Sequence, residues 1–206
     1  MTIRHPRKLL PSILLAVILV GCSRPFDTPT PTETIAPTPT ETATSTPIPD
    51  AQDIVLLSME ENGYAHLFFY IPQALPLTRL TYGAWDDVSP ALSPDGSQVA
   101  FASNRDGTWD LYVLNLDSGE TTRVTNSPEY ESAPSWSPDS QWLACELYRN
   151  ENLEIGIVSL TDGDQAPIPV TNEPSADHSP AWAPDGRHVA FVSNRSGDSE
   201  IWLADL

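Results

Sequence analysis

Short runs of alternating apolar and polar residues, separated by turn-forming residues, fill the chain from residue 51 onward. Within Gln98–Ser103, Val99 and Phe101 alternate with smaller or polar neighbours, as in a strand with one buried face. A similar run follows at Asp110–Asn115, and the sequence Pro94-Asp95-Gly96-Ser97 has the residue types of a tight turn. The pattern therefore predicts an all-β domain built from short antiparallel strands.

One segment of this pattern occurs three times. Ser93-Pro94-Asp95-Gly96 returns 44 residues later as Ser137-Pro138-Asp139-Ser140, and 46 residues after that as Ala183-Pro184-Asp185-Gly186. A period in the mid-forties with several short strands per unit is typical of β-propeller blades, each of which is a four-stranded antiparallel sheet. We therefore expect a β-propeller-like array over residues 51–206.

The repeat also predicts where each blade lies. We expect a partial blade at residues 53–81 without its inner strand, and complete blades at 84–125 and 128–171. A second partial blade is expected at 176–206 without its outer strand. The total is about 14 strands, or about three and a half blades, against a usual four to eight. The prediction is thus an incomplete propeller.

A different pattern occupies the first residues. A basic start containing Arg4, Arg7 and Lys8 precedes the apolar run Leu9–Val20. This run is too short for a comfortable membrane span but suits an export signal. It ends in Leu19-Val20-Gly21-Cys22, which resembles the lipobox of bacterial lipoproteins. The resemblance implies a signal peptide at 1–21 and lipid on Cys22, while an ordinary secretory signal and an uncleaved anchor remain alternatives.

Residues 22–50 are rich in threonine and proline. Nine threonines and six prolines lie between Thr28 and Pro49, with no helical or strand period. Such a composition cannot bury a core, and proline keeps the chain extended. We expect a disordered tether. O-glycosylation also suits this composition, although a plain spacer is the simpler interpretation.

The segment after Cys22 is strongly acidic. It holds all 28 carboxylates and seven arginines, so its formal net charge is −21. This charge argues against nucleic acid and against adsorption to anionic lipid surfaces. It favours cationic partners, divalent ions, or a role in solubility alone.

Two sets of charged residues recur with the repeat. The acids lie three residues before each repeat proline, at the start of the innermost strand: Asp87, Glu131 and Asp177. The arginines lie ten residues after each turn aspartate: Arg105, Arg149 and Arg195. One interpretation is an acidic rim around the central axis that binds a cation or a basic loop. The other is a salt bridge within each blade, because the second strand returns antiparallel to the start of the first.

Other polar residues suggest little chemistry. The repeated aspartates Asp95, Asp139 and Asp185 are interpreted as turn formers rather than ligands. His66, His178 and His188 are scattered, and the sequence contains no motif for a zinc or calcium site. We expect no catalytic residues, no metal and no cofactor.

The repeat resembles the propeller repeat of the TolB family. Its elements are Pro-x-Trp followed by Pro-Asp-Gly, an Ala-Phe strand, Ser-Asn-Arg, an acidic residue that opens the next strand, and a final Leu-Thr or Val-Thr. The propellers of prolyl-oligopeptidase-family enzymes are similar. The likeness covers Leu77–Leu206 well and Asp53–Leu75 loosely. It does not include the N-terminal α/β domain of TolB or a Gly-x-Ser-x-Gly nucleophile motif.

These observations favour a lipid-anchored, non-catalytic protein of the cell envelope, held on the outer face of the cell membrane or on the outer membrane. Its propeller would act as a scaffold that binds another envelope protein. A truncated fragment of a larger propeller protein and an accessory propeller of a peptidase-type enzyme are the alternatives. Because both end units are incomplete, two copies closing head to tail into a homo-oligomer is a further hypothesis.

Overall fold

The computed structural model describes residues 54–206 except residues 73, 162 and 164. The described residues form 14 β-strands and contain no helix. The expected signal peptide at 1–21, the tether at 22–50 and the lipidation site at Cys22 all lie outside the described residues.

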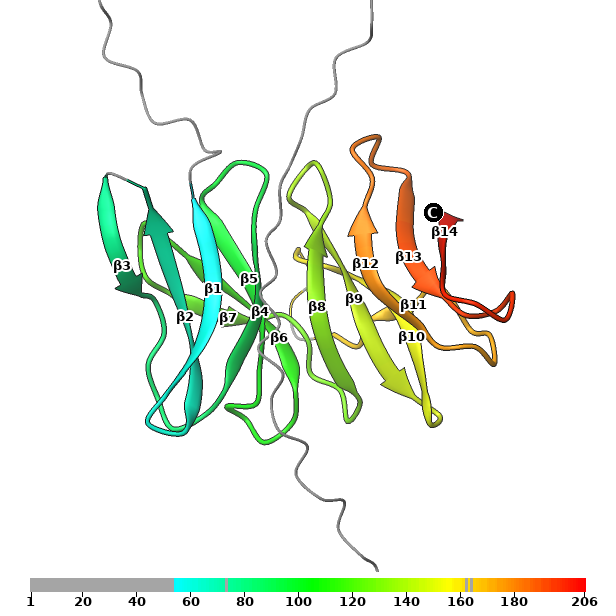
Figure 1. The fold of residues 1–206 in the computed structure, drawn as a ribbon, viewed down its shortest axis with the longest axis horizontal. Helices are drawn as coiled ribbons and strands as arrows, with labels where there is room; N and C mark the ends of the chain where they lie inside the picture. Colours follow the sequence, from blue (N-terminus) through cyan, green and yellow to red (C-terminus); the bar gives the residue numbers. More distant parts are fainter. Residues whose placement is uncertain (1–53, 73, 162, 164) are drawn as a thin grey trace, which may run out of the picture. The chain divides into compact units, whose positions relative to one another are not determined.

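The strands form four antiparallel sheets, each assembled in chain order (Figure 1). We call these sheets the first to fourth blades. The first holds β1 (Val55–Glu61), β2 (Tyr64–Ile71) and β3 (Leu75–Arg79). The second holds β4 (Asp87–Leu92), β5 (Gln98–Ser103), β6 (Asp110–Asn115) and β7 (Thr121–Arg123). The third holds β8 (Tyr130–Trp136), β9 (Trp142–Arg149), β10 (Asn152–Ser159) and β11 (Ile168–Pro169). The fourth holds β12 (Asp177–Trp182), β13 (His188–Ser193) and β14 (Glu200–Asp205). The predicted all-β array of antiparallel sheets is confirmed, and two of its sheets have four strands and two have three.

The repeated turn aspartates shape the hairpin between the first two strands of a complete repeat. The carboxylate of Asp95 accepts a hydrogen bond from the backbone N–H of Ser97 at 3.1 Å. Gly96 between them has a φ of 75°, which glycine adopts without a steric penalty. Asp139 and Asp185 accept the matching backbone bonds at 3.0 and 2.9 Å. The three residues therefore lie where turn formers are expected.

In each of the first three blades, a threonine just after the outer strand binds the strand that pairs with it. The hydroxyls of Thr81, Thr125 and Thr171 accept the backbone N–H of Leu67, Leu111 and Ile155 at 3.0, 2.8 and 2.9 Å. In each repeat the same strand residue also accepts a backbone hydrogen bond from the residue before the threonine. This threonine latch satisfies backbone groups that the short outer strand leaves unpaired.

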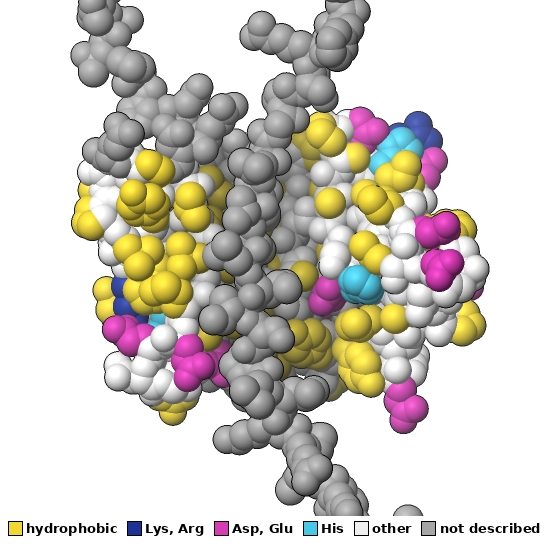
Figure 2. All heavy atoms as spheres, viewed as in Figure 1, with side chains coloured by type: hydrophobic (Ala, Val, Ile, Leu, Met, Phe, Trp, Pro, Cys, Tyr) yellow, Lys and Arg dark blue, Asp and Glu magenta, His cyan; other side chains and the backbone are white. Residues whose placement is uncertain are grey.

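The core lies between neighbouring blades. Leu111 of the second blade packs with Leu143 and Trp136 of the third, and the indole Nε1 of Trp136 donates to the carbonyl of Ala91 at 2.9 Å. Similar apolar clusters join the first blade to the second and the third to the fourth. Each blade therefore buries its faces only by stacking on its neighbours. Figure 2 shows hydrophobic side chains exposed over the sheet of β1–β3.

Candidate functional site

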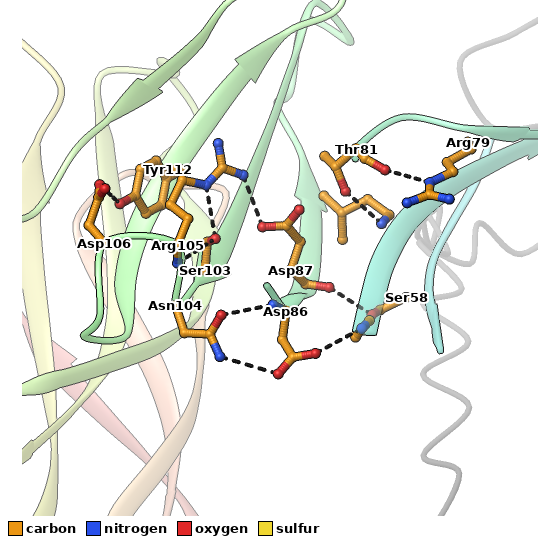
Figure 3. Close-up of polar contacts among 12 residues, drawn as sticks. Ser58, Arg79, Thr81, Asp86, Asp87, Ser103, Asn104, Arg105, Asp106 and Tyr112 are labelled. Carbon is orange, nitrogen blue, oxygen red and sulfur yellow. Dashed lines mark hydrogen bonds and ion pairs between the residues drawn. The ribbon is translucent and has the colours of Figure 1, made fainter. Parts of the chain in front are cut away.

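Asp87 and Arg105 form a buried ion pair at the inner end of the second blade (Figure 3). The carboxylate of Asp87 is fully buried, and its Oδ1 accepts from Nη2 of Arg105 at 2.9 Å. Nε of Arg105 donates to the hydroxyl of Ser103 at 3.0 Å. The guanidinium also lies 4.5 Å from the ring centre of Tyr112 and 5.3 Å from that of Phe101. The ring centre of Trp85 lies 5.4 Å away, so three rings and a hydroxyl fix the arginine on its acid.

The neighbouring Asp86 ties this cluster to the first blade. Its Oδ1 accepts the backbone N–H of Ala65 in β2 at 2.8 Å, and its Oδ2 accepts from Nδ2 of Asn104 at 3.2 Å (Figure 3). The hydroxyl of Ser58 in β1 donates to the carbonyl of Asp87 at 2.8 Å. The polar residues at the start of β4 thus join two blades.

The fourth blade repeats the ion pair of the second. Oδ2 of Asp177, which is also fully buried, accepts from Nη2 of Arg195 at 2.8 Å. Nε of Arg195 donates to Ser193 at 2.9 Å, and its guanidinium lies over the rings of Phe191 and Trp202. The expected salt bridge within the blade is present in both repeats.

The third blade departs from this arrangement. Glu131 accepts hydrogen bonds from the hydroxyls of Thr125 and Ser127, and no ion pair to it is present among the described residues. Arg149 instead approaches Glu129, with 3.6 Å between Nε and Oε1, at a site where both side chains are about a third exposed. The expectation that Arg149 pairs with Glu131 is therefore wrong.

Three substitutions explain the departure. Residues Leu147, Cys145 and Gly156 occupy the repeat positions of Ser103, Phe101 and Tyr112. They remove the hydroxyl and the two ring contacts that the second and fourth blades share around the arginine. These three differences are visible in the sequence, but their effect on Arg149 can be predicted only once the contacts of Arg105 are known.

Burial raises the pKa of Glu131 to about 7 from its ordinary 4.5, against the opposing effect of the hydrogen bonds from Ser127 and Thr125. The charges of Asp110 and Glu129 add to the rise. Burial likewise raises the pKa of the neighbouring Cys145 thiol, which is free and fully buried. A thiol in this state is a packing residue rather than a nucleophile.

The three repeated acids do not form an exposed rim. Asp87, Glu131 and Asp177 are all fully buried. Each accepts hydrogen bonds from its own blade or from the segment just before it. The expectation of an acidic rim open to a cation or a basic loop is corrected accordingly, because no face of these carboxylates is open to solvent.

A feature that the sequence reasoning missed lies on the same strands. Each inner strand has a bulge at the residue before the repeat proline, where the pairing register shifts. Ser89, Ala133 and Ser179 have φ values of 54°, 49° and 55° there. This backbone conformation is uncommon for residues other than glycine, and a following proline disfavours it further. Ser89 and Ser179 are exposed and Ala133 is half-buried.

The histidines remain apart from one another. His178 lies 3.0 Å from the hydroxyl of Ser179, and the backbone N–H of Ser179 donates to Glu146 at 2.9 Å. His188 contacts the turn aspartate Asp185, whose pKa is lowered to about 2, chiefly by the backbone N–H of Arg187 and the ring of His188. No group of metal-ligating side chains is present among the described residues. The same residues form no helix, so they contain no helix that could cross a membrane.

Comparison with known proteins shows which family of repeats these resemble. Residues 110–206 match the model of the TolB beta propeller domain. Over these residues the repeats are TolB-like β-propeller repeats. Of the curated proteins, the Tol-Pal system protein TolB of Desulfosudis oleivorans is 35% identical over 66 residues, covering 32% of this chain and 15% of that protein.

Peptidase propellers are similar as well. The uncharacterized peptidase YuxL of Bacillus subtilis is 28% identical over 110 residues, covering 52% of this chain and 17% of that protein. Among solved structures, TolB from Acinetobacter baumannii superposes with a TM-score of 0.61 at 18% identity, covering 75% of this chain and 38% of that one. The TolB-like chain thus spans less than a fifth of these two curated relatives, and the structural likeness establishes the fold.

Proposed function

We propose that this protein is an exported, lipid-anchored protein of the cell envelope whose TolB-like propeller binds another envelope protein without catalysing a reaction. The observation that carries the proposal is that the repeated acidic residues are used for structural contacts within the protein. The acids at the inner strands are buried, and Asp87 and Asp177 each pair with an arginine of their own blade. The similarity to a Tol-Pal system protein supports a place in the envelope.

The bulged inner strands are the surface that we assign to the partner. Strained backbone and bulges recur at binding sites because they re-aim side chains away from the regular ladder. Here the same strain occurs at Ser89, Ala133 and Ser179, so three blades present one feature on neighbouring inner strands. The net charge of −21 after Cys22 favours a partner with a basic segment.

Site-specific photo-crosslinking in the host tests this assignment. A photoreactive residue at Ser179 or at Ser89 of the full chain is expected to capture the same envelope protein. The matched control is Ser118, an exposed residue of the turn between β6 and β7, where no capture is expected. Equal capture at Ser118, or different proteins at the two bulges, would contradict a binding surface on the inner strands.

The anchor is tested separately. Metabolic labelling with a palmitate analogue is expected to label the full chain and not the Cys22→Ser variant, which should also leave the membrane fraction. A Cys145→Ser variant is the matched control, because its thiol is buried and should not accept lipid. Retention of the label in Cys22→Ser would exclude lipidation at that residue.

An accessory role beside a peptidase is the second candidate, favoured by the similarity to YuxL. In that case the full chain should co-purify from its host with a hydrolase that cleaves short peptide substrates. Peptidase activity that follows the tagged chain through two purification steps would favour this candidate over the scaffold.

A further inference from the structure

The fourth blade has an apolar face that no other described residue covers. Five apolar side chains lie on one face of its paired strands: Ala181, Ala190, Val192, Ile201 and Leu203. We call this set the trailing face. Ile201 is 78% exposed and Leu203 is 66% exposed. The opposite face of the same sheet packs into the core through Val189 and Phe191.

The second blade, which has the same repeat, shows what kind of surface packs against such a face. The second blade carries the matching residues Ala91, Ala100, Ala102, Leu111 and Val113, each 90 positions earlier in the chain. There the face is covered by the next blade, through Trp136, Leu143, Cys145 and Val158. Leu111, which matches Ile201, is fully buried. A blade face of the same repeat type is therefore the occupant that this surface fits.

The first blade presents the complementary surface. We call it the leading face, formed by Val55, Leu57 and Met59 of β1 and by Tyr70 of β2. Phe68 of β2 lies on the same side of the sheet but is only 8% exposed. The latch threonines align Leu67 with Leu111, so Phe68 and Tyr70 match Tyr112 and Leu114, whose side chains pack against the first blade. On the leading face Val55 is 48% exposed, Tyr70 39% and Met59 37%.

We propose that the trailing face of one copy binds the leading face of a second copy, head to tail. This contact continues the series of blade-to-blade packings already present at three junctions within the chain. Two copies bring together two sets of four sheets, within the range of about four to eight blades that propellers close with. Exposed apolar surfaces of this kind mark association sites, and head-to-tail contacts form rings when the rotation closes. The proposal does not depend on the identity of any envelope partner.

Co-purification of two differently tagged full chains, co-expressed in the host, tests the contact. Wild-type copies are expected to retain one another. Two copies that both carry Ile201→Asp, or that both carry Val55→Asp, should lose at least tenfold of that retention, because each junction then buries a carboxylate in an apolar contact. The matched control is Ile168→Asp on β11, where the isoleucine is 56% exposed outside both faces, and retention should be unchanged.

A mixed pair decides the orientation. One copy with Ile201→Asp and one with Val55→Asp still share an intact junction, so they should retain each other although neither variant retains itself. This recovery also shows that both variants fold. The proposal is overturned if wild-type copies do not retain one another, if Ile201→Asp copies retain each other as well as wild type, or if the mixed pair fails. Failure of the mixed pair with loss in Ile201→Asp alone indicates a symmetric contact between two trailing faces instead.

Discussion

Glu131 is the repeated acid that an arginine does not neutralise within the described residues. Its counterparts Asp87 and Asp177 pair with Arg105 and Arg195, whereas Glu131 has two hydroxyl partners and a raised pKa. A buried carboxyl without a cation lowers the cost of burial by binding a proton. The middle of the array therefore carries a group that titrates near neutral pH.

This titration makes stability depend on pH in a defined direction. Because the folded pKa of about 7 lies above the ordinary 4.5, the stabilising contribution is complete below pH 4.5 and is lost as pH rises through 7. As pH rises from 4.5 to above 7, the unfolding free energy of wild type should fall by about 3 kcal/mol relative to that of Glu131→Gln. Urea unfolding at a series of pH values measures the difference. Glu120→Gln, in an exposed turn, is the control and should follow wild type.

The arginines predict a second contrast at the scale of single residues. Arg105→Met leaves the fully buried carboxylate of Asp87 without its cation and should cost about 3 kcal/mol of unfolding free energy. Arg149→Met breaks a longer pair between partly exposed side chains and should cost less than about 1 kcal/mol. Equal losses in urea unfolding would contradict the expectation that leaving the buried carboxylate of Asp87 without its cation is costly.

At the scale of the element, the repeated turns differ at one backbone position. Gly96 and Gly186 adopt φ values of 75° and 74°, and Ser140 adopts 59° at the same place in the third blade. A residue with a Cβ is strained there, although glycine loses more backbone entropy on folding. The Ser140→Gly variant should therefore gain up to about 1 kcal/mol of stability.

The matched change tests the same balance in reverse. Gly96→Ser should lower the unfolding free energy by about as much as Ser140→Gly raises it, since nothing lies within 4 Å of a Cβ added at Gly96. Thermal unfolding of the two variants against wild type measures both. A loss of stability in Ser140→Gly would show that entropy outweighs the strain at this turn.

Most strands were predictable because their pattern is local. Gln98–Ser103 and Asp110–Asn115 have the expected bounds, since alternation and turn residues delimit them. The exposed bulges and the buried state of the acids were not predictable in this way. Bulges at Ser89 and Ser179 depend on pairing with the next strand, and the burial of Asp87 depends on the blade beside it. The repeat also suggested that each arginine pairs with the repeated acid of its own blade. Arg149 does not, because the residues around it differ from those around Arg105 and Arg195.

At the scale of the whole molecule, stability comes from junctions between blades rather than from single sheets. Three apolar clusters join the four blades, and the polar contacts of Asp86 and Ser58 add to the first junction. Such stacked arrays gain stability from each added neighbour. A blade with an uncovered face is consequently the weakest unit, which is why a partner for the trailing face would stabilise the fourth blade.

Net charge opposes this stacking throughout the molecule. The chain after Cys22 carries 28 carboxylates and seven arginines, so compact and associated states both suffer self-repulsion at low salt. Raising NaCl from about 0.01 M to about 0.15 M shortens the Debye length from about 30 Å to about 8 Å and screens this repulsion. Urea midpoints of the full chain should therefore rise over this range and then level off. The buried pairs of Arg105 and Arg195 are screened much less, so they do not reverse the trend. A midpoint that falls as salt is added would show that the exposed ion pairs, such as that of Arg187 with Asp205, outweigh the repulsion.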